Sequence, residues 1–178
     1  MIGAKLTRGA IFVSLTIGLT SCAAPDQPLV STGPASDYMR EINQLTFDPA
    51  RNAAADVDTA LAAARASGKH VLLIMGGDWC HDSIALADLF TSPRFAAMLG
   101  ARYELVWAHV PRSLDERDPA IARRFGLDSI VGTPTVLILN NQGVAINLAD
   151  APRWRNAASR KPEAVYRHFA RAVQPVTN

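Results

Sequence analysis

Five consecutive apolar residues, Val71-Leu72-Leu73-Ile74-Met75, limit most strongly how this chain can fold. A run this short, ended by Gly76 and Gly77, is typical of a β-strand that is buried on both faces. Large apolar side chains on both faces of a strand need to be covered, and helices usually cover them. The chain contains 49% hydrophobic residues, which is enough to form such a core. The run therefore predicts a sheet that is flanked by helices.

The rest of the chain alternates helical and strand patterns around this run. Asp56 can cap the first helix, and Gly68 can end it. Alternating elements imply a parallel part of the sheet, and a terminal hairpin adds an antiparallel edge. The predicted class is therefore α/β with a mixed sheet. Helices are expected at about residues 56–68, 80–90, 93–99 and 119–125 and from Pro162 onward; strands are expected at 71–75, 103–110, 136–139 and 144–148, with a turn at 140–143.

The N-terminus resembles a bacterial lipoprotein signal. Lys5 and Arg8 precede an apolar run at residues 11–19, and small residues then lead to Cys22. The resemblance implies cleavage just before Cys22 and lipidation of its sulfur. It also implies a place in the cell envelope, on the periplasmic face of the outer membrane, because Ala23 replaces the aspartate that favours inner-membrane retention. The alternative is an uncleaved membrane helix, but the run is much shorter than the roughly 20 residues needed to cross a bilayer.

The chain divides into three predicted parts. Residues 1–21 form the signal peptide, residues 22–55 carry the lipidated cysteine and a tether rich in proline and small polar residues, and residues 56–178 form the folded domain. The two basic side chains of the signal leave sixteen basic and sixteen acidic side chains in residues 22–178. This balance indicates no nucleic-acid partner. The expected partners are thiol or disulfide substrates, either proteins or small molecules, and the membrane that holds the lipid.

Two motifs resemble those of a known protein family. Trp79-Cys80-His81-Asp82-Ser83 follows the buried strand at the start of a helix, and Gly132-Thr133-Pro134-Thr135 precedes a later strand. Together they resemble the thioredoxin-like superfamily over about residues 56–173. The resemblance implies that Cys80 is the nucleophile and that Pro134 is a cis-proline beside the thiol, before the terminal hairpin. It further implies that the backbone of Thr133 pairs with an extended substrate and that Trp79 flanks the thiol.

Local chemistry also favours a reactive Cys80. Unpaired N–H groups and the positive end of the dipole at a helix N-terminus stabilise a thiolate, so we expect its pKa below the free value of roughly 8.5. Ser83, one turn on, can donate a hydrogen bond to the sulfur. A protonated His81 could add positive charge, whereas the carboxylate of Asp82 would oppose a second anion.

The sequence departs from the family pattern at two positions. Ser83 replaces the second cysteine of the motif, and Ile74 replaces the buried acid that serves that second cysteine in thioredoxins. With Cys22 lipidated, Cys80 is the only thiol left. It could form mixed disulfides that an outside thiol resolves, or the domain could bind partners through the cis-proline groove without turnover. Both hypotheses stay open on the sequence.

No cofactor and no metal are expected. His81 beside Cys80 could ligate a metal, but His70, His109 and His168 lack the spacing that would complete a site. Trp154 lies between two arginines and could mark a contact patch. A tryptophan packed under arginine stems is the commoner arrangement.

Overall fold

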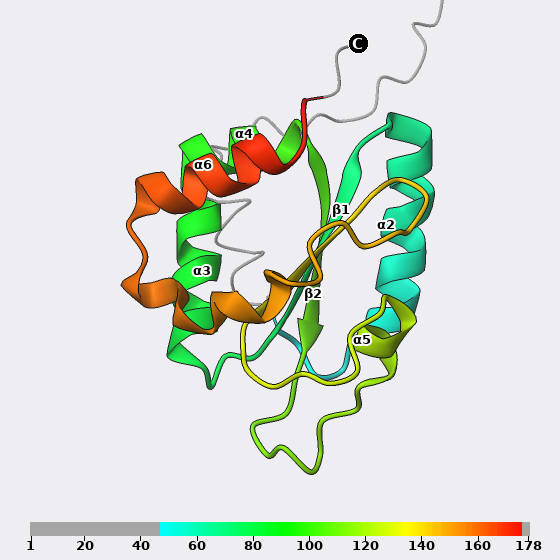
Figure 1. Cartoon of the computed structure of the whole chain (residues 1–178), viewed down its shortest axis with the longest axis vertical. Coiled ribbons are helices and arrows are strands. Elements are labelled where there is room, and N and C mark those ends of the chain that lie inside the picture. The colour runs from blue at the N-terminus through cyan, green and yellow to red at the C-terminus, as the bar shows by residue number, and fades with distance from the viewer. Residues whose placement is uncertain (1–46, 176–178) are drawn as a thin grey trace, which may run out of the picture. The chain divides into compact units, whose positions relative to one another are not determined.

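The computed structural model describes residues 47–175 of the 178-residue chain, and a three-stranded sheet lies at its centre (Figure 1). Its strands are β1 (His70–Gly76), β2 (Tyr103–His109) and β3 (Thr135–Leu139), in the order β2-β1-β3. β1 runs parallel to β2 and antiparallel to β3. This arrangement confirms the predicted mixed sheet with the apolar run as a strand, and it places that strand in the middle. Cys22 and the predicted signal and tether up to residue 46 lie outside the described residues.

Helices cover both faces of the sheet. α3 (His81–Thr91), α4 (Pro93–Gly100) and α6 (Pro162–Ala172) lie on one face, whereas α2 (Ala53–Ser67) and α5 (Ala120–Arg124) lie on the other (Figure 1). These helices agree with the predicted ones to within a few residues at either end. The predicted flanking of the sheet by helices is therefore confirmed. Within residues 47–175, no helix combines the length and the apolar character needed to cross a membrane.

The side chains of β1 divide the core into two layers. Leu72 and Ile74 pack with α3, α4 and α6, and Val71, Leu73 and Met75 pack with α2 and α5. All five are fully buried. Burial of such side chains contributes about 1.5–3 kcal/mol each. Burial of side chains on both faces holds β1 firmly in the core. The end of β1, where the cysteine motif begins, is therefore fixed in position.

The first helix starts earlier than the sequence suggested. Asn52 is its N-cap, and the Asn52 side chain accepts a hydrogen bond of 3.1 Å from the N–H of Ala55. Asp56 instead lies inside the first turn, so the prediction of Asp56 as the cap is wrong. Alanines after Asn52 are strong helix formers, which lets the helix extend back to that earlier cap. Gly68, with a φ of 75°, ends the helix as predicted.

The prediction of a second strand in the terminal hairpin is wrong. Residues 144–148 form no strand, and only Ala145 makes a β-bridge, to Leu139. The side chain of Asn147 instead serves the edge of β3: its Oδ1 accepts from the N–H of Ile138 at 2.7 Å, and its Nδ2 donates to the carbonyl of Val136 at 2.9 Å. An amide side chain satisfies the same backbone groups that a neighbouring strand would satisfy.

A 3-10 segment, η1 (Ala151–Ser159), follows and was not predicted. It has contacts with α3 and β3, on the α6 side of the sheet. Its Trp154 is buried, with the guanidinium of Arg160 4.4 Å from the ring centroid. Trp154 is therefore packed beneath an arginine and is not part of an exposed contact patch.

Candidate functional site

Cys80 lies where β1 passes into α3. It is the N-cap residue of that helix, its N–H donates to the carbonyl of Gly77 at 2.9 Å, and its own carbonyl accepts from Ile84 at 3.0 Å. The thiol is half-buried, and the described residues contain no other cysteine. The turn therefore aims the sulfur at the positive end of α3 while leaving part of it open to solvent.

The loop before β3 lies directly against this thiol. The Thr133–Pro134 peptide bond is cis, and the Cys80 Sγ donates to the carbonyl of Thr133 at 3.3 Å. The hydroxyl of Thr135 donates to the carbonyl of Gly132 at 2.7 Å, which closes the loop around the proline. The structure thus brings together three predicted site residues, Cys80, Thr133 and Pro134, although 53 positions separate the cysteine from the threonine.

Ser83 is completely buried behind the thiol. Its Oγ has no hydrogen-bond partner among residues 47–175. A side chain at Gly76 would place its Cβ only 2.6 Å from that oxygen, so glycine is required there. Burying a hydroxyl without a partner costs free energy, and a thiolate at Cys80 would supply the missing acceptor.

The environment lowers the pKa of Cys80. Burial has the largest single effect and acts in the opposite direction, because a thiolate loses solvation. Hydrogen bonding by the Thr133 and Ser83 side chains, and then by the backbone N–H groups of Ser83 and Asp82, more than offsets burial. The contact with the Thr133 carbonyl holds the protonated thiol and is lost on ionisation. Hydrogen bonds from the loop that carries Thr133 and from the start of α3, and no charged side chain, therefore favour the thiolate.

Trp79 is fixed next to the thiol. Its Nε1 donates to the carbonyl of Val110 at 2.8 Å, and its ring folds back over Gly77 so closely that no side chain fits there. Arg112 and Arg117 each place a guanidinium 5.6 Å from the centroid of the ring. These contacts hold the Trp79 ring in one position, at the residue before Cys80.

Arg117 connects the loops around the site. Its Nε donates to the carbonyl of Pro111 and its Nη1 to the carbonyl of Ile130, both at 3.0 Å. The loop after β2 is thereby joined to the loop that carries Thr133. The sequence analysis did not single out Arg117, because a lone arginine in a charged loop has no local pattern that identifies its distant partners.

The rim of the site contains further residues that the sequence analysis did not identify. Ile84 and Val131 are exposed apolar side chains, one on the first turn of α3 and the other two residues before Thr133. The aliphatic stem of Arg155, from η1, packs over Gly132 at about 3.1 Å from an added Cβ. Ile84 and Val131 therefore offer exposed apolar area on the two segments that carry Cys80 and Thr133. Only the fold brings η1 to this loop.

The two side chains between Cys80 and Ser83 face elsewhere. His81 is exposed, and Asp82 Oδ1 accepts a 2.9 Å hydrogen bond from the N–H of Ala158 in η1. Neither side chain contributes to the lowered pKa of Cys80, so the expected effects of their charges are not seen. In the part of the chain that the structure describes, no three histidine, cysteine or acidic side chains are grouped as metal ligands.

Comparisons with known proteins agree with this geometry. The chain matches the model of a family described as Thioredoxin-like over residues 52–141, just over half of its length. It is similar to the solved structure of a disulphide isomerase from Xylella fastidiosa Temecula1, with 25% sequence identity and a TM-score of 0.63; the match covers 71% of this chain and 95% of that one. No curated protein matches it. The predicted thioredoxin-like α/β fold is confirmed.

Proposed function

Because the chain belongs to the thioredoxin-like family, we propose that it carries out thiol–disulfide exchange with Cys80 as a single nucleophilic thiol. The observation that supports this most is the position of the Cys80 sulfur. It is half-buried at the start of α3, 3.3 Å from the Thr133 carbonyl, with its pKa lowered by hydrogen bonds. A thiolate is the attacking species in exchange, so this environment increases the fraction of the reactive form.

The proposed reaction of Cys80 has two steps. The Cys80 thiolate attacks one sulfur of a substrate disulfide, which forms a new S–S bond to the substrate and releases the other sulfur as a thiolate that takes a proton from water. A second thiol then attacks the mixed disulfide and regenerates Cys80. If outside thiols act, the first attacks the substrate sulfur of the mixed disulfide, releases Cys80 and becomes joined to the substrate. A second outside thiol then attacks that adduct, so that the substrate is reduced to two thiols and the two outside thiols are oxidised to a disulfide. If the thiol that attacks the mixed disulfide belongs to the substrate, the substrate disulfide is rearranged with no net change in oxidation.

The second route fits a chain with one available thiol. Rearrangement needs a nucleophile that starts the exchange, and the substrate itself supplies the sulfur that ends it. The related solved structure is named a disulphide isomerase. Ser83 supports the thiolate in this proposal, whereas Trp79, Thr133 and Pro134 form the platform on which an extended substrate lies.

A glutathionylation assay tests this proposal. The native full chain is incubated with oxidised glutathione, and intact mass is measured before and after addition of reduced glutathione. We expect one glutathionyl group on Cys80, its removal by the outside thiol, and no adduct at this position in Cys80→Ala. The alternative is a module that only binds partners through the cis-proline groove. It predicts an unreactive native thiol that forms the adduct only after unfolding in urea, and that result would refute the exchange proposal.

We also propose that a lipidated Cys22 holds the protein in the cell envelope, on the periplasmic face of the outer membrane. The sequence of the N-terminus supports this, with Lys5 and Arg8, the apolar run and Cys22 in order. Several acyl chains together give stable anchoring. The test expresses the chain in a bacterium with two membranes and separates them. Wild type should fractionate with the outer membrane and Cys22→Ala should not, and equal fractionation of both would reject the anchor.

A further inference from the structure

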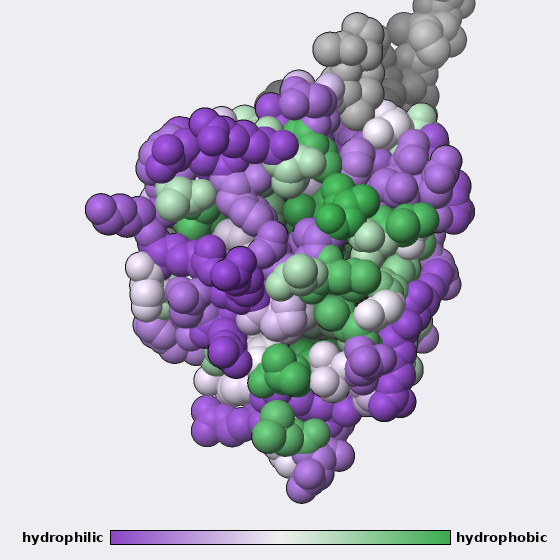
Figure 2. Space-filling model, in the orientation of Figure 1, coloured by the Kyte–Doolittle hydropathy of each residue, from purple (hydrophilic) through white to green (hydrophobic). Residues whose placement is uncertain are grey.

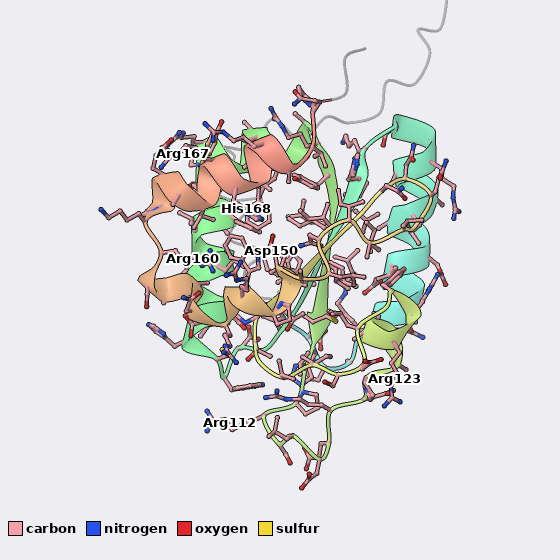
Figure 3. All side chains as sticks on the ribbon, in the orientation of Figure 1. Arg112, Arg123, Asp150, Arg160, Arg167 and His168 are labelled. Carbon is pink, nitrogen blue, oxygen red and sulfur yellow. The ribbon has the colours of Figure 1, made fainter. Side chains whose placement is uncertain are left out.

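A depression lies between η1 and α6, on the side of η1 that faces α6. Two adjoining pockets form it, the larger of about 680 Å³ and the other of about 530 Å³, and both are lined by Asp150 and His168. We call it the η1–α6 groove. Figure 3 shows His168 pointing from α6 into this space, where Asp150 and Arg160 also lie. A groove of this volume accommodates a small organic ligand.

Arginines dominate the lining of the groove. Five of them contribute to it, and the only carboxylate is that of Asp150, which forms an ion pair of 3.0 Å with Arg153. Among residues 47–175, the other four form no ion pair with a carboxylate. Figure 2 shows the hydrophilic surface over η1 and α6. The lining of the groove therefore carries a net positive charge. The five are Arg153, Arg155, Arg160, Arg167 and Arg171.

His168 provides a second, independent observation. Its Nε2 is buried and has no hydrogen-bond partner within the described residues. Its ring packs edge-on against Trp154, with centroids 4.9 Å apart, and that tryptophan in turn lies beneath Arg160. A buried ring nitrogen without a partner costs free energy, so this position favours a ligand that offers a hydrogen-bonding group.

Part of the remaining lining is apolar. Ile138, Ile146 and Ala164 line the smaller pocket next to Arg167 and Arg171. A ligand that fills the groove would therefore place an anionic end among the arginines and part of its carbon skeleton against these side chains. Phosphate suits the anionic end, because the planar fork of an arginine donates two hydrogen bonds to two phosphate oxygens.

We propose that the η1–α6 groove binds a small phosphate ester, such as a glycerol phosphate group, through Arg160, Arg167 and Arg171. Two sources share this chemistry, a soluble phosphate ester and the headgroup of an anionic phospholipid. The site is separate from the Cys80 thiol and does not rest on thiol exchange. Binding here would hold a ligand or a lipid surface on the α6 side of the domain.

The test uses the full chain with Cys22→Ala, so that no acyl group mediates membrane contact. Calorimetry with glycerol 3-phosphate tests the soluble source, and flotation with phosphatidylglycerol vesicles against phosphatidylcholine vesicles tests the lipid source. Arg167→Gln and Arg171→Gln should each weaken binding about tenfold, as expected for a charged hydrogen bond. Arg123→Gln is the matched control, because that exposed arginine belongs to α5 on the opposite face of the sheet.

Each result decides the proposal. Binding of glycerol 3-phosphate, or of phosphatidylglycerol vesicles alone, supports it and identifies the source, provided that the groove variants lose it and Arg123→Gln keeps it. If Arg123→Gln weakened binding as much as the groove variants do, binding would depend on the overall charge of the protein, and the proposal would be overturned. Absence of binding in both arms would overturn it as well. Arg160→Gln is left out of the decision because that arginine also packs on Trp154.

Discussion

Replacing Ser83 by alanine should make Cys80 less acidic without weakening the fold. The hydroxyl of Ser83 is one of the groups that lower the pKa of Cys80, and among the described residues it has no other hydrogen-bond partner. A hydrogen bond to a charged group is worth about 1.5–3 kcal/mol, which we reduce to about 1 kcal/mol because the sulfur is partly solvated. Ser83→Ala should therefore lower the ratio of thiolate to thiol about fivefold.

The rate of alkylation by iodoacetamide, measured across pH, tests this magnitude. In Ser83→Ala the fraction of thiolate falls about fivefold, but the more basic thiolate that remains reacts about twofold faster. The alkylation rate at neutral pH should therefore fall about two- to threefold, and the midpoint of its pH dependence should move to higher pH. Urea unfolding at a pH where the thiol is protonated should give an unchanged or higher free energy of unfolding, because a buried hydroxyl without a partner is removed.

Ser92→Ala is the matched control for Ser83→Ala. The Ser92 hydroxyl, at the other end of α3, donates to the carbonyl of Leu89 at 2.9 Å. Its loss should reduce the free energy of unfolding by about 0.5–1.5 kcal/mol and leave the Cys80 rate unchanged. The reasoning would be refuted if Ser83→Ala destabilised the protein like this control and did not move the alkylation midpoint.

Three further outcomes follow from the same structure. Arg117→Gln should lower the free energy of unfolding by about 1–3 kcal/mol in urea titrations, since it leaves two partly buried loop carbonyls without these donors, whereas exposed Arg123→Gln should have little effect. Asn147→Ala should speed hydrogen exchange at the N–H of Ile138 and cost about 1–3 kcal/mol; unchanged exchange would contradict the role given to this amide. Finally, the lowered pKa of Cys80 makes its ionisation stabilise the fold above the unfolded thiol's pKa of about 8.5, and this contribution is lost as pH falls through the folded pKa. The difference in unfolding free energy between wild type and Cys80→Ala should thus grow in favour of wild type as pH rises, and a flat difference would contradict it.

Local patterns predicted the central elements well. The run at residues 71–75 could only be a buried strand or a short piece of buried helix, and the glycines after it favoured the strand. Cys80 and Pro134 are placed by that strand and by β3, so a sequence that identifies both strands also predicts that the two residues meet. Asp56 was the predicted cap of the first helix, but Asn52, four positions earlier, has an equal preference for that position and is the cap in the structure.

Local patterns did not predict where a side chain makes the hydrogen bonds that a neighbouring strand would otherwise make, or where distant loops meet. The segment at 144–148 alternates like a strand, but the amide of Asn147 takes the hydrogen bonds that a strand would take. η1 begins at Ala151 with Pro152 and lacks a helical repeat, so nothing in its pattern marked it. The contacts of Arg155 with Gly132, and of Arg117 with Ile130, depend on loops meeting in space. These are the parts of the site that required the fold.

The dependence of Cys80 alkylation on pH in the native folded chain tests the central claim most directly. The rate is measured against that of an unstructured cysteine peptide under the same conditions, with Cys22→Ala in the chain so that a single thiol reacts. The hydrogen bonds at the start of α3 predict a midpoint below that of the peptide. A midpoint equal to or above that of the peptide, with slow labelling, would mean that Cys80 is an inert thiol and would contradict its proposed role as a nucleophile.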